Sequence, residues 1–436
     1  MRFYDRNEEL AILKRNEKQS LETAVFTVLT GRRRVGKTSL IQKAISEKGM
    51  AYLFVSKDSE PILCRRFQET IEDKLGIEIH GQTTHMRELF EILMKESSKR
   101  HFTIFFDEFQ NFQKVNPAIF SDLQDIWDRY HSESHIHLVV SGSIRSLMRK
   151  IFEDSGEPLY GRPTSKMQLQ PFRTDVLKEI LTENNPSWTN EDLLCLYMIT
   201  GGVAKYVELL ADAGCLTKKK MLDYVCRPDS YFLTEGRDLL NQEFSEESST
   251  YFSVLQLIAG GMTKRSEMDD IMGKDMGVYL QNLEKNFFMV KRLKPLLSKP
   301  GSKTTAYEIA DPFLRFWFRF IWPYQSLVET RQLGRLREYI EKGYETFSGK
   351  TLERYFQQKL MESGQYTQVG NWWNRKGENE VDIVALDEFS HEGLVAEVKR
   401  NPKKIDLATL EEKMKAFPAQ FKEYELKLEG FSLDSL

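Results

Sequence analysis

The chain has 436 residues and a formal net charge of -3, and at roughly 150 residues per domain this length predicts about three domains. Hydrophobic residues make up 41% and charged residues 29%, which excludes wholesale disorder. The near-neutral charge excludes a polybasic protein, so a nucleic-acid surface must be a local patch. Four cysteines without a CxxC pair argue against a disulfide framework or a zinc ribbon. Because the sequence shows neither an apolar signal region nor a long apolar run, we expect a cytoplasmic protein with no membrane partner.

Short apolar runs alternate with amphipathic stretches between Ala24 and Leu169. The runs AVFTVL, AYLFV, FTIFF and IHLVV carry few polar residues, as expected for strands of a parallel sheet that is buried on both faces. The stretches between them have the period of covering helices. This order predicts a doubly wound α/β core over residues 1–171.

The rest of the chain predicts three further regions. Helical patterns alone fill residues 172–240. Within residues 241–334, three short helical patterns precede two strand-like runs, FFMVKRL and TAYEIA, which is a winged-helix pattern. The aromatic segment FLRFWFRFIWPY follows, and we interpret it as a packing core between domains. Residues 335–436 combine a long charged helical pattern, three strand-like runs and a last helix, which predicts a second α/β domain.

Residues 31–38 read GRRRVGKT and match the phosphate-loop pattern G-x-x-x-x-G-K-[ST]. Gly31 and Gly36 let backbone N–H groups approach phosphate oxygens, and Lys37 supplies a charge that reaches the β- and γ-phosphates. Thr38 presents a hydroxyl to Mg²⁺, and the helix that starts here directs its positive end at the phosphates. We therefore predict a site for ATP and Mg²⁺ that is formed by Gly31, Arg32, Arg33, Arg34, Val35, Gly36, Lys37, Thr38 and Ser39.

The run FTIFFDEF, residues 102–109, places Asp107 at the carboxyl end of a strand, where an open α/β sheet has its ligand crevice. There Asp107 can orient Mg²⁺ through water, and Glu108 can act as the general base toward the attacking water. A general base at this position is typical of a hydrolase rather than of a simple nucleotide binder. Lys37, Asp107 and Glu108 are thus the predicted catalytic residues of an ATPase.

Three further polar residues stay open to two interpretations. Ser141 and Ser143 in HLVVSGS follow a third strand, where they can bind the γ-phosphate or the attacking water, or form an ordinary polar turn. Arg162 in LYGR can stabilise charge on the transferred phosphoryl group, or it is an ordinary surface arginine.

Several of these motifs together resemble a known family. The runs FYDRNEELAIL, GRRRVGKTSLI, FFDEFQ, VSGS, YGR, ITGGVAKY and YEIADPFLRFWFRFI resemble the archaeal-type ATPases, which are AAA+-related P-loop ATPases of the signal-transducing (STAND) class. The resemblance covers essentially the whole chain. It implies that Phe3 and Arg6 lie near the nucleotide and that residues 202–206 belong to a helical lid. Ala204 departs from the family, which often has proline at this position.

Three carboxylates and a lysine mark the tail. Asp382 lies in EVDIVA, and Glu397 and Lys399 lie in AEVKR, where residues two apart on a strand project to one face. Two carboxylates on adjacent strands can hold Mg²⁺ or Mn²⁺ while the lysine places the attacking hydroxide, and Glu353 is a candidate third carboxylate. The order of elements resembles the PD-(D/E)XK, restriction-endonuclease-like fold, and the archaeal-type ATPases carry a related domain at this place. A solvated charged face is the alternative, and DNA cleavage stays a hypothesis.

The hairpin of the predicted winged helix is rich in basic residues, which either neutralise DNA phosphates without reading sequence or only keep the hairpin soluble. These residues are Lys291, Arg292, Lys294, Lys299 and Lys303. Three functions therefore compete. The first is an ATP-hydrolysing switch that engages DNA through its winged-helix and nuclease-like domains. The second is a metal-dependent DNA nuclease gated by ATP, and the third is a non-hydrolysing, nucleotide-dependent regulator that binds DNA or a protein. A homo-oligomer or a protein partner is compatible with each of them.

Overall fold

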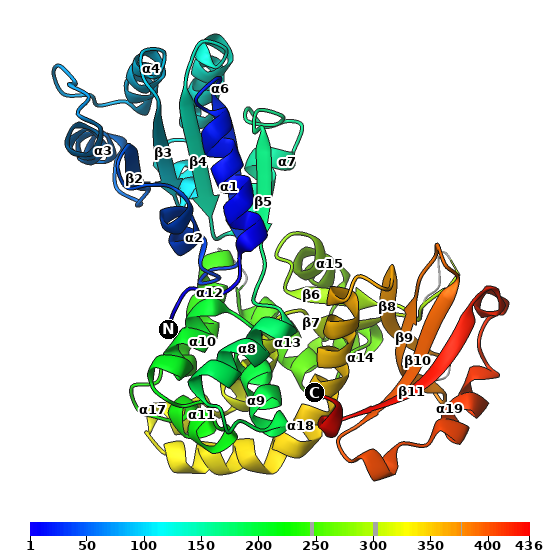
Figure 1. The fold of residues 1–436 in the computed structure, drawn as a ribbon. Coiled ribbons are helices and arrows are strands. Elements are labelled where there is room, and N and C mark those ends of the chain that lie inside the picture. The colour runs from blue at the N-terminus through cyan, green and yellow to red at the C-terminus, as the bar shows by residue number, and fades with distance from the viewer. Residues whose placement is uncertain (245–247, 300–303, 376) are drawn as a thin grey trace. The chain divides into compact units, whose positions relative to one another are not determined.

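The computed structural model describes residues 1–244, 248–299, 304–375 and 377–436. These form two compact units (Figure 1). The N-terminal unit is Asp5–Gln170, and the C-terminal unit is Pro171–Leu436 together with Met1–Tyr4. Lys303 of the predicted wing lies outside the described residues. Over the ranges that are described, no helix is long and apolar enough to cross a membrane.

The N-terminal unit is built on a five-stranded sheet in the order β2-β3-β4-β1-β5, and every pairing in it is parallel. This confirms the predicted doubly wound α/β core. Its elements are α1 (Asn7–Gln19), β1 (Val25–Gly31), α2 (Lys37–Ala44), β2 (Met50–Phe54), α3 (Glu60–Leu75), α4 (Met86–Ser97), β3 (Phe102–Asp107), η1 (Phe109–Asn111), α5 (Phe112–Val115), α6 (Ala118–Tyr130), β4 (Ile136–Gly142), α7 (Arg145–Glu153) and β5 (Ser165–Leu169).

Helices cover both faces of this sheet, as Figure 1 shows. Phe26 and Val28 of β1 belong to a hydrophobic cluster with side chains of α3, α4, α6 and α7, whereas Leu29 faces the opposite cluster with α1 and α2. Alternate residues of one strand therefore both find apolar partners, which explains the near-continuous apolar runs in the sequence. Only β4 separates β1 from β3, so their carboxyl ends meet at one edge of the sheet.

The C-terminal unit is mostly helical before it ends in a second sheet. Three helices, α13 to α15, are followed by the antiparallel hairpin β6–β7, in the order that the sequence predicted. The elements are α8 (Thr174–Asn184), α9 (Asn190–Thr200), α10 (Ala204–Asp212), α11 (Lys218–Val225), α12 (Phe232–Glu243), α13 (Ser248–Ala259), α14 (Arg265–Met272), α15 (Gly277–Lys285), β6 (Val290–Leu293), β7 (Ala306–Ile309), α16 (Pro312–Phe320), η2 (Trp322–Tyr324), α17 (Gln325–Glu329), α18 (Leu333–Glu362), β8 (Gln368–Trp373), β9 (Glu380–Leu386), β10 (Glu392–Lys399), η3 (Pro402–Lys404), α19 (Leu407–Met414), η4 (Ala419–Glu423), β11 (Glu425–Ser432) and η5 (Leu433–Ser435).

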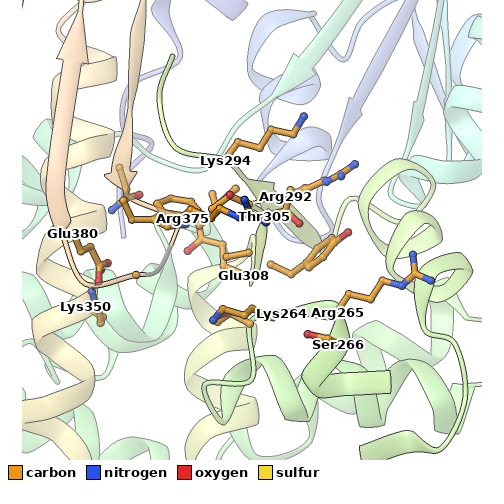
Figure 2. A pocket seen from close by; sticks show the side chains of 18 of the residues that line it. Lys264, Arg265, Ser266, Arg292, Lys294, Thr305, Glu308, Lys350, Arg375 and Glu380 are labelled. Carbon is orange, nitrogen blue, oxygen red and sulfur yellow. Dashed lines mark ion pairs between the residues drawn. The ribbon is translucent and has the colours of Figure 1, made fainter. Parts of the chain in front are cut away.

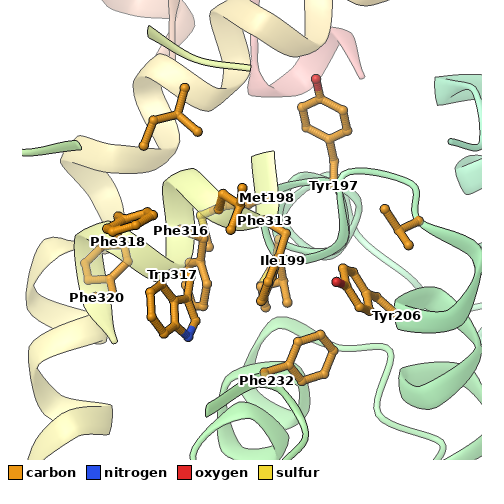
Figure 3. Packing of buried hydrophobic residues seen from close by; sticks show 14 of the residues in the cluster. Tyr197, Met198, Ile199, Tyr206, Phe232, Phe313, Phe316, Trp317, Phe318 and Phe320 are labelled. Atoms are coloured by element: carbon orange, nitrogen blue, oxygen red, sulfur yellow. The ribbon is translucent and has the colours of Figure 1, made fainter. Parts of the chain in front are cut away.

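The aromatic segment forms α16, and Figure 3 shows its side chains from Phe313 to Phe320 among buried residues of this unit. Asp311 caps the helix by accepting a hydrogen bond from the backbone N of Leu314 at 3.1 Å, and Pro312 fits the first turn. Trp317 is fully buried and lies so close to α12 that a Cβ on Gly236 would be 2.2 Å from its ring. One hydrophobic cluster extends from α16 over α8 to the last residues of the chain. The subdivision of this unit into a lid, a winged-helix domain and a nuclease-like domain stays a prediction.

The second sheet has four strands in the order β11-β10-β9-β8. Ile383 of β9 packs into the cluster that contains residues of α18, whereas the next residue, Val384, faces the cluster with α19. The sheet is therefore covered on both faces. The strand β11 was missing from the sequence prediction. It runs parallel to β10 at an edge of the sheet and is largely exposed, so charged residues alternate with apolar ones and the apolar signal is weak.

Candidate active site

The phosphate-loop motif lies between β1 and α2, at the carboxyl edge of the parallel sheet. Gly31 closes β1 so tightly against β5 that a Cβ there would lie 2.7 Å from the backbone oxygen of Leu169. Gly36 has a φ of 100°, a conformation that favours glycine, and α2 begins at the next residue. Val35 anchors the loop in the apolar cluster with α1 and α2. The first backbone N–H groups of α2 and its positive dipole end therefore face the loop.

Lys37 is the first residue of α2 and is almost completely buried. Its Nζ donates hydrogen bonds to the backbone oxygens of Gly31 at 3.0 Å and Arg32 at 3.3 Å. Burial lowers the pKa of Lys37, although the charges of Glu108 and Asp107 oppose this effect. The ammonium group is thus held inside the curve of the loop, where it can exchange backbone oxygens for phosphate oxygens.

The other loop residues surround this point. Arg34 has a φ of 69°, and the charge of Arg33 contributes to the lowered pKa of Lys37. Ser39 lies in the first turn of α2 and is exposed. The roles of these residues toward a nucleotide stay predictions.

Asp107 ends β3 and is buried among hydroxyl groups. The hydroxyls of Thr38 and Tyr52 donate to its Oδ2 at 2.8 and 3.1 Å, and Ser141 donates to its Oδ1. Burial raises the pKa of Tyr52, and the charge of Asp107 adds to this shift, so the phenol remains a donor. The three hydroxyl donors are neutral, and they orient the carboxylate without cancelling its charge.

Glu108 follows directly and has a φ of 57°, which is uncommon for a residue with a side chain. Its Oε2 accepts hydrogen bonds from Ser143 Oγ at 2.7 Å and from Gln110 Nε2 at 2.5 Å. Within the described part of the chain, its Oε1 has no hydrogen-bond partner. The unusual backbone and the two donors fix the direction of the carboxylate, and Oε1 stays available to a water molecule.

These residues fit ATP with Mg²⁺. A side chain on Gly31 would collide with Leu169 of β5 and displace the start of the loop, and the hydroxyl of Thr38 with the carboxylate of Asp107 supplies the oxygen ligands that Mg²⁺ prefers. Ser141 and Ser143 bond to the two carboxylates. They therefore help to position Asp107 and Glu108, while contact of Ser141 or Ser143 with the γ-phosphate or the attacking water stays a prediction.

Arg162 lies at the opposite edge of the sheet. The backbone N of Thr164 bonds to the backbone oxygen of Phe26 at 2.9 Å, so this segment pairs with the start of β1, whereas the loop follows its end. The seven residues of β1, at about 3.3 Å each, separate the two places. The guanidinium of Arg162 instead pairs with Asp128 at 3.0 Å. The prediction that Arg162 stabilises a phosphoryl group bound to its own chain is therefore wrong.

Two residues were placed near the nucleotide by the family resemblance. Arg6 is buried in the N-terminal unit, and its Nη2 donates to the backbone oxygen of Gln170 at 2.7 Å. Since Gly31 pairs with Leu169 in the sheet, Arg6 lies next to the strand end that borders the loop. Phe3 belongs to the C-terminal unit and is 37% exposed. Contact of either residue with a nucleotide stays a prediction.

Known protein families match two parts of the chain. Residues 3–210 match a family described as an ATPase domain predominantly from Archaea. The chain carries an archaeal-type ATPase domain. Residues 317–417 match a family described as archaeal and bacterial proteins of unknown function. The resemblance drawn from the sequence motifs is thereby confirmed.

One relative and two solved structures are similar to most of this chain. The uncharacterized protein MJECL04 of Methanocaldococcus jannaschii is 29% identical over 411 residues, which are 91% of this chain and 87% of that protein. Among solved structures, the Walker-type ATPase PABY2304 of Pyrococcus abyssi has a TM-score of 0.53 and 21% identity over 73% of this chain and 96% of that one. The ORC1 protein of Aeropyrum pernix, solved with DNA, is more distant, with a TM-score of 0.39 and 13% identity over 74% of this chain and 94% of that one. At these identities the solved structures show the fold alone.

The C-terminal carboxylates are only partly assembled as predicted. Lys399 Nζ lies 3.2 Å from Asp382 Oδ2 and 3.1 Å from Glu397 Oε1. Asp382 also accepts from the backbone N of Val398 at 2.9 Å, and Glu397 accepts from the backbone N of Asp406 at 2.8 Å. Burial lowers the pKa of Lys399, but the two carboxylates raise it by more, so that the pKa lies above its ordinary value. The lysine is therefore a charged bridge between them.

Glu353 does not complete a set of three metal ligands. Its Oε2 lies 3.0 Å from Lys350 Nζ, which also lies 3.5 Å from Glu380 Oε1. Burial raises the pKa of Glu353 to about 8, although Lys350 opposes this effect. The described residues contain no group of three or more His, Cys, Asp or Glu side chains that could hold a metal ion. The prediction of a three-carboxylate metal site is thus wrong for this structure, because Glu353 pairs with a lysine.

Sequence reasoning missed Tyr52 and Gln110. Tyr52 lies on β2, one strand beyond β3 in the sheet, and nothing in the run AYLFV distinguishes a phenol that reaches Asp107 from one in a core. Gln110 lies two residues after Glu108. A signal for it existed, since a polar residue two positions after a carboxylate is placed to bond to it.

Proposed function

We propose that the chain binds ATP with Mg²⁺ at residues 31–39 and hydrolyses it, and that the nucleotide state governs its engagement of DNA. The observation that carries this proposal is the arrangement of Glu108. Its carboxylate is held at one oxygen by Ser143 and Gln110 while the other oxygen is open. It lies next to the Asp107–Thr38 pair, where a general base for an attacking water is needed.

Each residue of the site then has a stated task. The loop and the N-terminus of α2 bind phosphate oxygens through backbone N–H groups, and Lys37 adds a positive charge. Thr38 and Asp107 hold Mg²⁺, which supplies charge neutralisation on the phosphates. Glu108 accepts a proton from the attacking water at Oε1. Ser141 and Ser143 keep the two carboxylates in place.

The test measures ATP binding and ATP turnover separately. Glu108→Gln keeps the size of the side chain and removes the base, so we expect nucleotide binding to persist while turnover falls about 10²- to 10⁴-fold. Lys37→Ala should lose binding itself. Glu69→Gln changes an exposed glutamate of α3 and serves as the matched control. Turnover of Glu108→Gln at the wild-type rate would contradict hydrolysis and favour a non-hydrolysing regulator.

The DNA part of the proposal rests on the C-terminal unit. Three helices and a basic hairpin follow the order of a winged helix, and such hairpins neutralise DNA phosphates. Turnover measured with and without DNA tests the connection, since stimulation by DNA would join the two units functionally. If DNA neither binds nor changes the rate of ATP turnover, the proposed engagement of DNA is wrong, while the proposed ATP hydrolysis is unaffected.

Metal-dependent DNA cleavage is the second candidate function. One observation favours it: Asp382, Glu397 and Lys399 come together on adjacent strands in an α/β fold. Cleavage of plasmid or single-stranded DNA with Mg²⁺ or Mn²⁺, abolished by Asp382→Ala, would support it. The absence of cleavage with either metal would leave a binding or structural domain.

A further inference from the structure

A cavity of about 1080 Å³ lies inside the C-terminal unit. The start of α14 and the hairpin β6–β7 form one side of it, and α18, β8 and the connection to β9 form the other. Figure 2 shows Lys264, Arg292 and Lys294 on the first side and Lys350, Arg375 and Glu380 on the second. The volume slightly exceeds the roughly 300–1,000 Å³ of small-molecule pockets, so a ligand larger than a metabolite has room.

The two sides of the cavity are fastened to each other. The backbone N of Leu296, beyond β6, donates to the backbone oxygen of Asn371 on β8 at 3.0 Å. The Leu296 side chain packs against the apolar cluster of the second sheet, where a Cβ on Gly370 would lie 2.5 Å from it. Arg354 of α18 also bonds to Glu308 of β7 at 2.7 Å. The hairpin is therefore seated on the sheet rather than free-standing, and the cavity is part of the folded structure.

The cavity carries an excess of unpaired positive charge. Its acidic side chains each have a cationic neighbour: Glu308 pairs with Arg354, and Glu353 and Glu380 pair with Lys350. Asp269 lies 3.4 Å from Arg265. Four exposed basic residues that line the cavity form no ion pair within the described ranges, and these are Lys264, Arg292, Lys294 and Arg375. A polyanion would supply the missing countercharge.

An aromatic side chain faces the same space. Neighbouring residues of a strand point to opposite faces, and Trp372 is buried in the apolar cluster of the sheet while Trp373 lines the cavity. Trp373 is half-exposed and has no ring partner among the described residues. A half-exposed tryptophan beside unpaired cations is the combination on which bases stack while phosphates are neutralised.

We propose that this cavity binds single-stranded nucleic acid. The cations contact successive phosphates, and Trp373 stacks on an unpaired base. A duplex does not satisfy both requirements, because its bases are already stacked on each other and only its backbone is accessible to the cations. An acidic peptide would satisfy the charges but not the stacking platform. This inference rests on the proposed function, since it names the nucleic acid that the C-terminal unit engages.

The test compares two triple variants that remove the same charge. Arg292→Ala/Lys294→Ala/Arg375→Ala changes three unpaired cations of the cavity. Lys403→Ala/Lys422→Ala/Lys427→Ala changes three exposed lysines of the same unit that lie outside both the cavity and the basic hairpin. Binding of short fluorescent oligo(dT), oligo(U) and a hairpin duplex is measured by anisotropy over a series of salt concentrations, and the first two probes distinguish DNA from RNA.

We expect the wild-type protein to prefer the single strands. The cavity triple variant should lose at least tenfold in affinity, and its salt slope should fall by about 2, since each phosphate contact with a single strand contributes roughly 0.7. Trp373→Ala should lose roughly tenfold and Trp373→Phe should restore most of the loss. The control triple variant should stay within about twofold to threefold of the wild type. Nucleotide binding, which belongs to the N-terminal unit, and thermal unfolding verify that each variant is folded.

Several outcomes would overturn the inference. Equal losses in the two triple variants would reveal general electrostatic attraction, and wild-type affinity of Trp373→Ala would remove the stacking platform. Displacement of oligo(dT) by polyglutamate at equal charge concentration would assign the cavity to acidic peptides. A protein that binds only the duplex, unaffected by the cavity variants, refutes the single-strand site but keeps the proposed engagement of DNA. Loss of both would show as no binding to any of the three nucleic acids.

Discussion

In the N-terminal unit, the side-chain hydrogen bonds to Asp107 and Glu108 come from hydroxyl and amide groups, whereas Asp382 and Glu397 in the C-terminal unit share the ammonium group of Lys399. Both are pairs of carboxylates on or next to strands of a sheet, and they differ in the groups that bond to them. Neutral donors orient a carboxylate and leave its charge to a metal ion, while a lysine already supplies the countercharge. The carboxylates of the first site are therefore arranged to bind a metal ion, whereas those of the second already have a positively charged partner.

The same contrast applies to Glu353. It is buried against Lys350 and a second carboxylate, Glu380, competes for that lysine. The ATPase domain thus surrounds its acids with neutral hydrogen-bond donors, and the C-terminal unit pairs its acids with lysines. Variants that remove the neutral donors from the first site, or the cations from the second, test whether this comparison holds.

Removal of the donors to Glu108 should have the largest effect. In Ser143→Ala/Gln110→Ala the carboxylate loses both hydrogen bonds at Oε2 and is no longer directed toward the attacking water. We expect kcat for ATP to fall about thirtyfold, which is a part of the 10²- to 10⁴-fold that a general base contributes, with KM within about twofold of the wild type. Steady-state turnover measures both.

Ser121→Ala, at an exposed position of α6, is the control for this variant. A rise in KM with unchanged kcat would mean that Ser143 or Gln110 serves nucleotide binding rather than the orientation of the base. In that case Ser143 and Gln110 would not orient the Glu108 carboxylate. The claim that neutral donors prepare the carboxylates of the N-terminal unit would then be wrong.

Removal of the bridging lysine should have a smaller effect of the opposite sign. Lys399→Met keeps the length of the side chain and leaves Asp382 and Glu397 without their shared cation. We expect affinity for Mn²⁺ in the C-terminal unit to increase about tenfold, because a divalent ion then supplies the countercharge. Calorimetry with Lys399→Met/Asp382→Asn as reference separates this site from the one at Asp107.

Lys404→Met, at an exposed position of η3, controls for the loss of a surface charge. Unchanged Mn²⁺ affinity in Lys399→Met would show that the two carboxylates are not arranged to share a metal ion. Tight Mn²⁺ binding by the wild-type protein at Asp382 would also contradict the comparison. It would show that Lys399 does not replace the metal ion as the partner of the carboxylates.

Features that depend on a short stretch of sequence could be predicted. The loop of residues 31–38 and the Asp107–Glu108 pair could be predicted because each lies at the end of an apolar strand, and a parallel sheet brings such ends together. The same argument did not identify Tyr52, whose contact with Asp107 depends on which strands are neighbours. The position of Arg162 depends on the direction and register of β5, and the short motif LYGR contains no information on either.

The C-terminal unit shows the same limit. The alternation of residues in β9 and β10 predicted that Glu397 and Lys399 share a face, and they do lie close enough to interact. That Lys350 takes Glu353 out of the carboxylate set follows from their spacing on one helix turn, three residues apart. The spacing of Lys350 and Glu353 is visible in the sequence, but the sequence prediction assigned Glu353 to a metal site instead of to this ion pair. The seating of Leu296 on Gly370 is a long-range contact, for which no local pattern exists.

The smallest predicted effect concerns Glu353 and pH. Burial raises its pKa from the ordinary 4.5 to about 8, so the folded state retains a proton that the unfolded chain releases. A raised pKa contributes stability that is fully present below the unfolded value and is lost as pH rises through the folded one. The free energy of unfolding should therefore decrease between about pH 4.5 and 8, by at most about 5 kcal/mol at roughly 1.4 kcal/mol for each pKa unit.

Glu353→Gln replaces the acid with a neutral side chain of the same shape, so the variant should unfold at the same temperature as the wild type near pH 5 and a few degrees higher near pH 8. Thermal unfolding followed by circular dichroism at the two pH values measures this difference, with Glu345→Gln at an exposed position of the same helix as control. If Glu353→Gln is instead less stable than the wild type at pH 8, the ion pair with Lys350 outweighs the cost of burial. Glu353 would then be charged in the folded state, and the C-terminal unit would hold a carboxylate that can bind a cation.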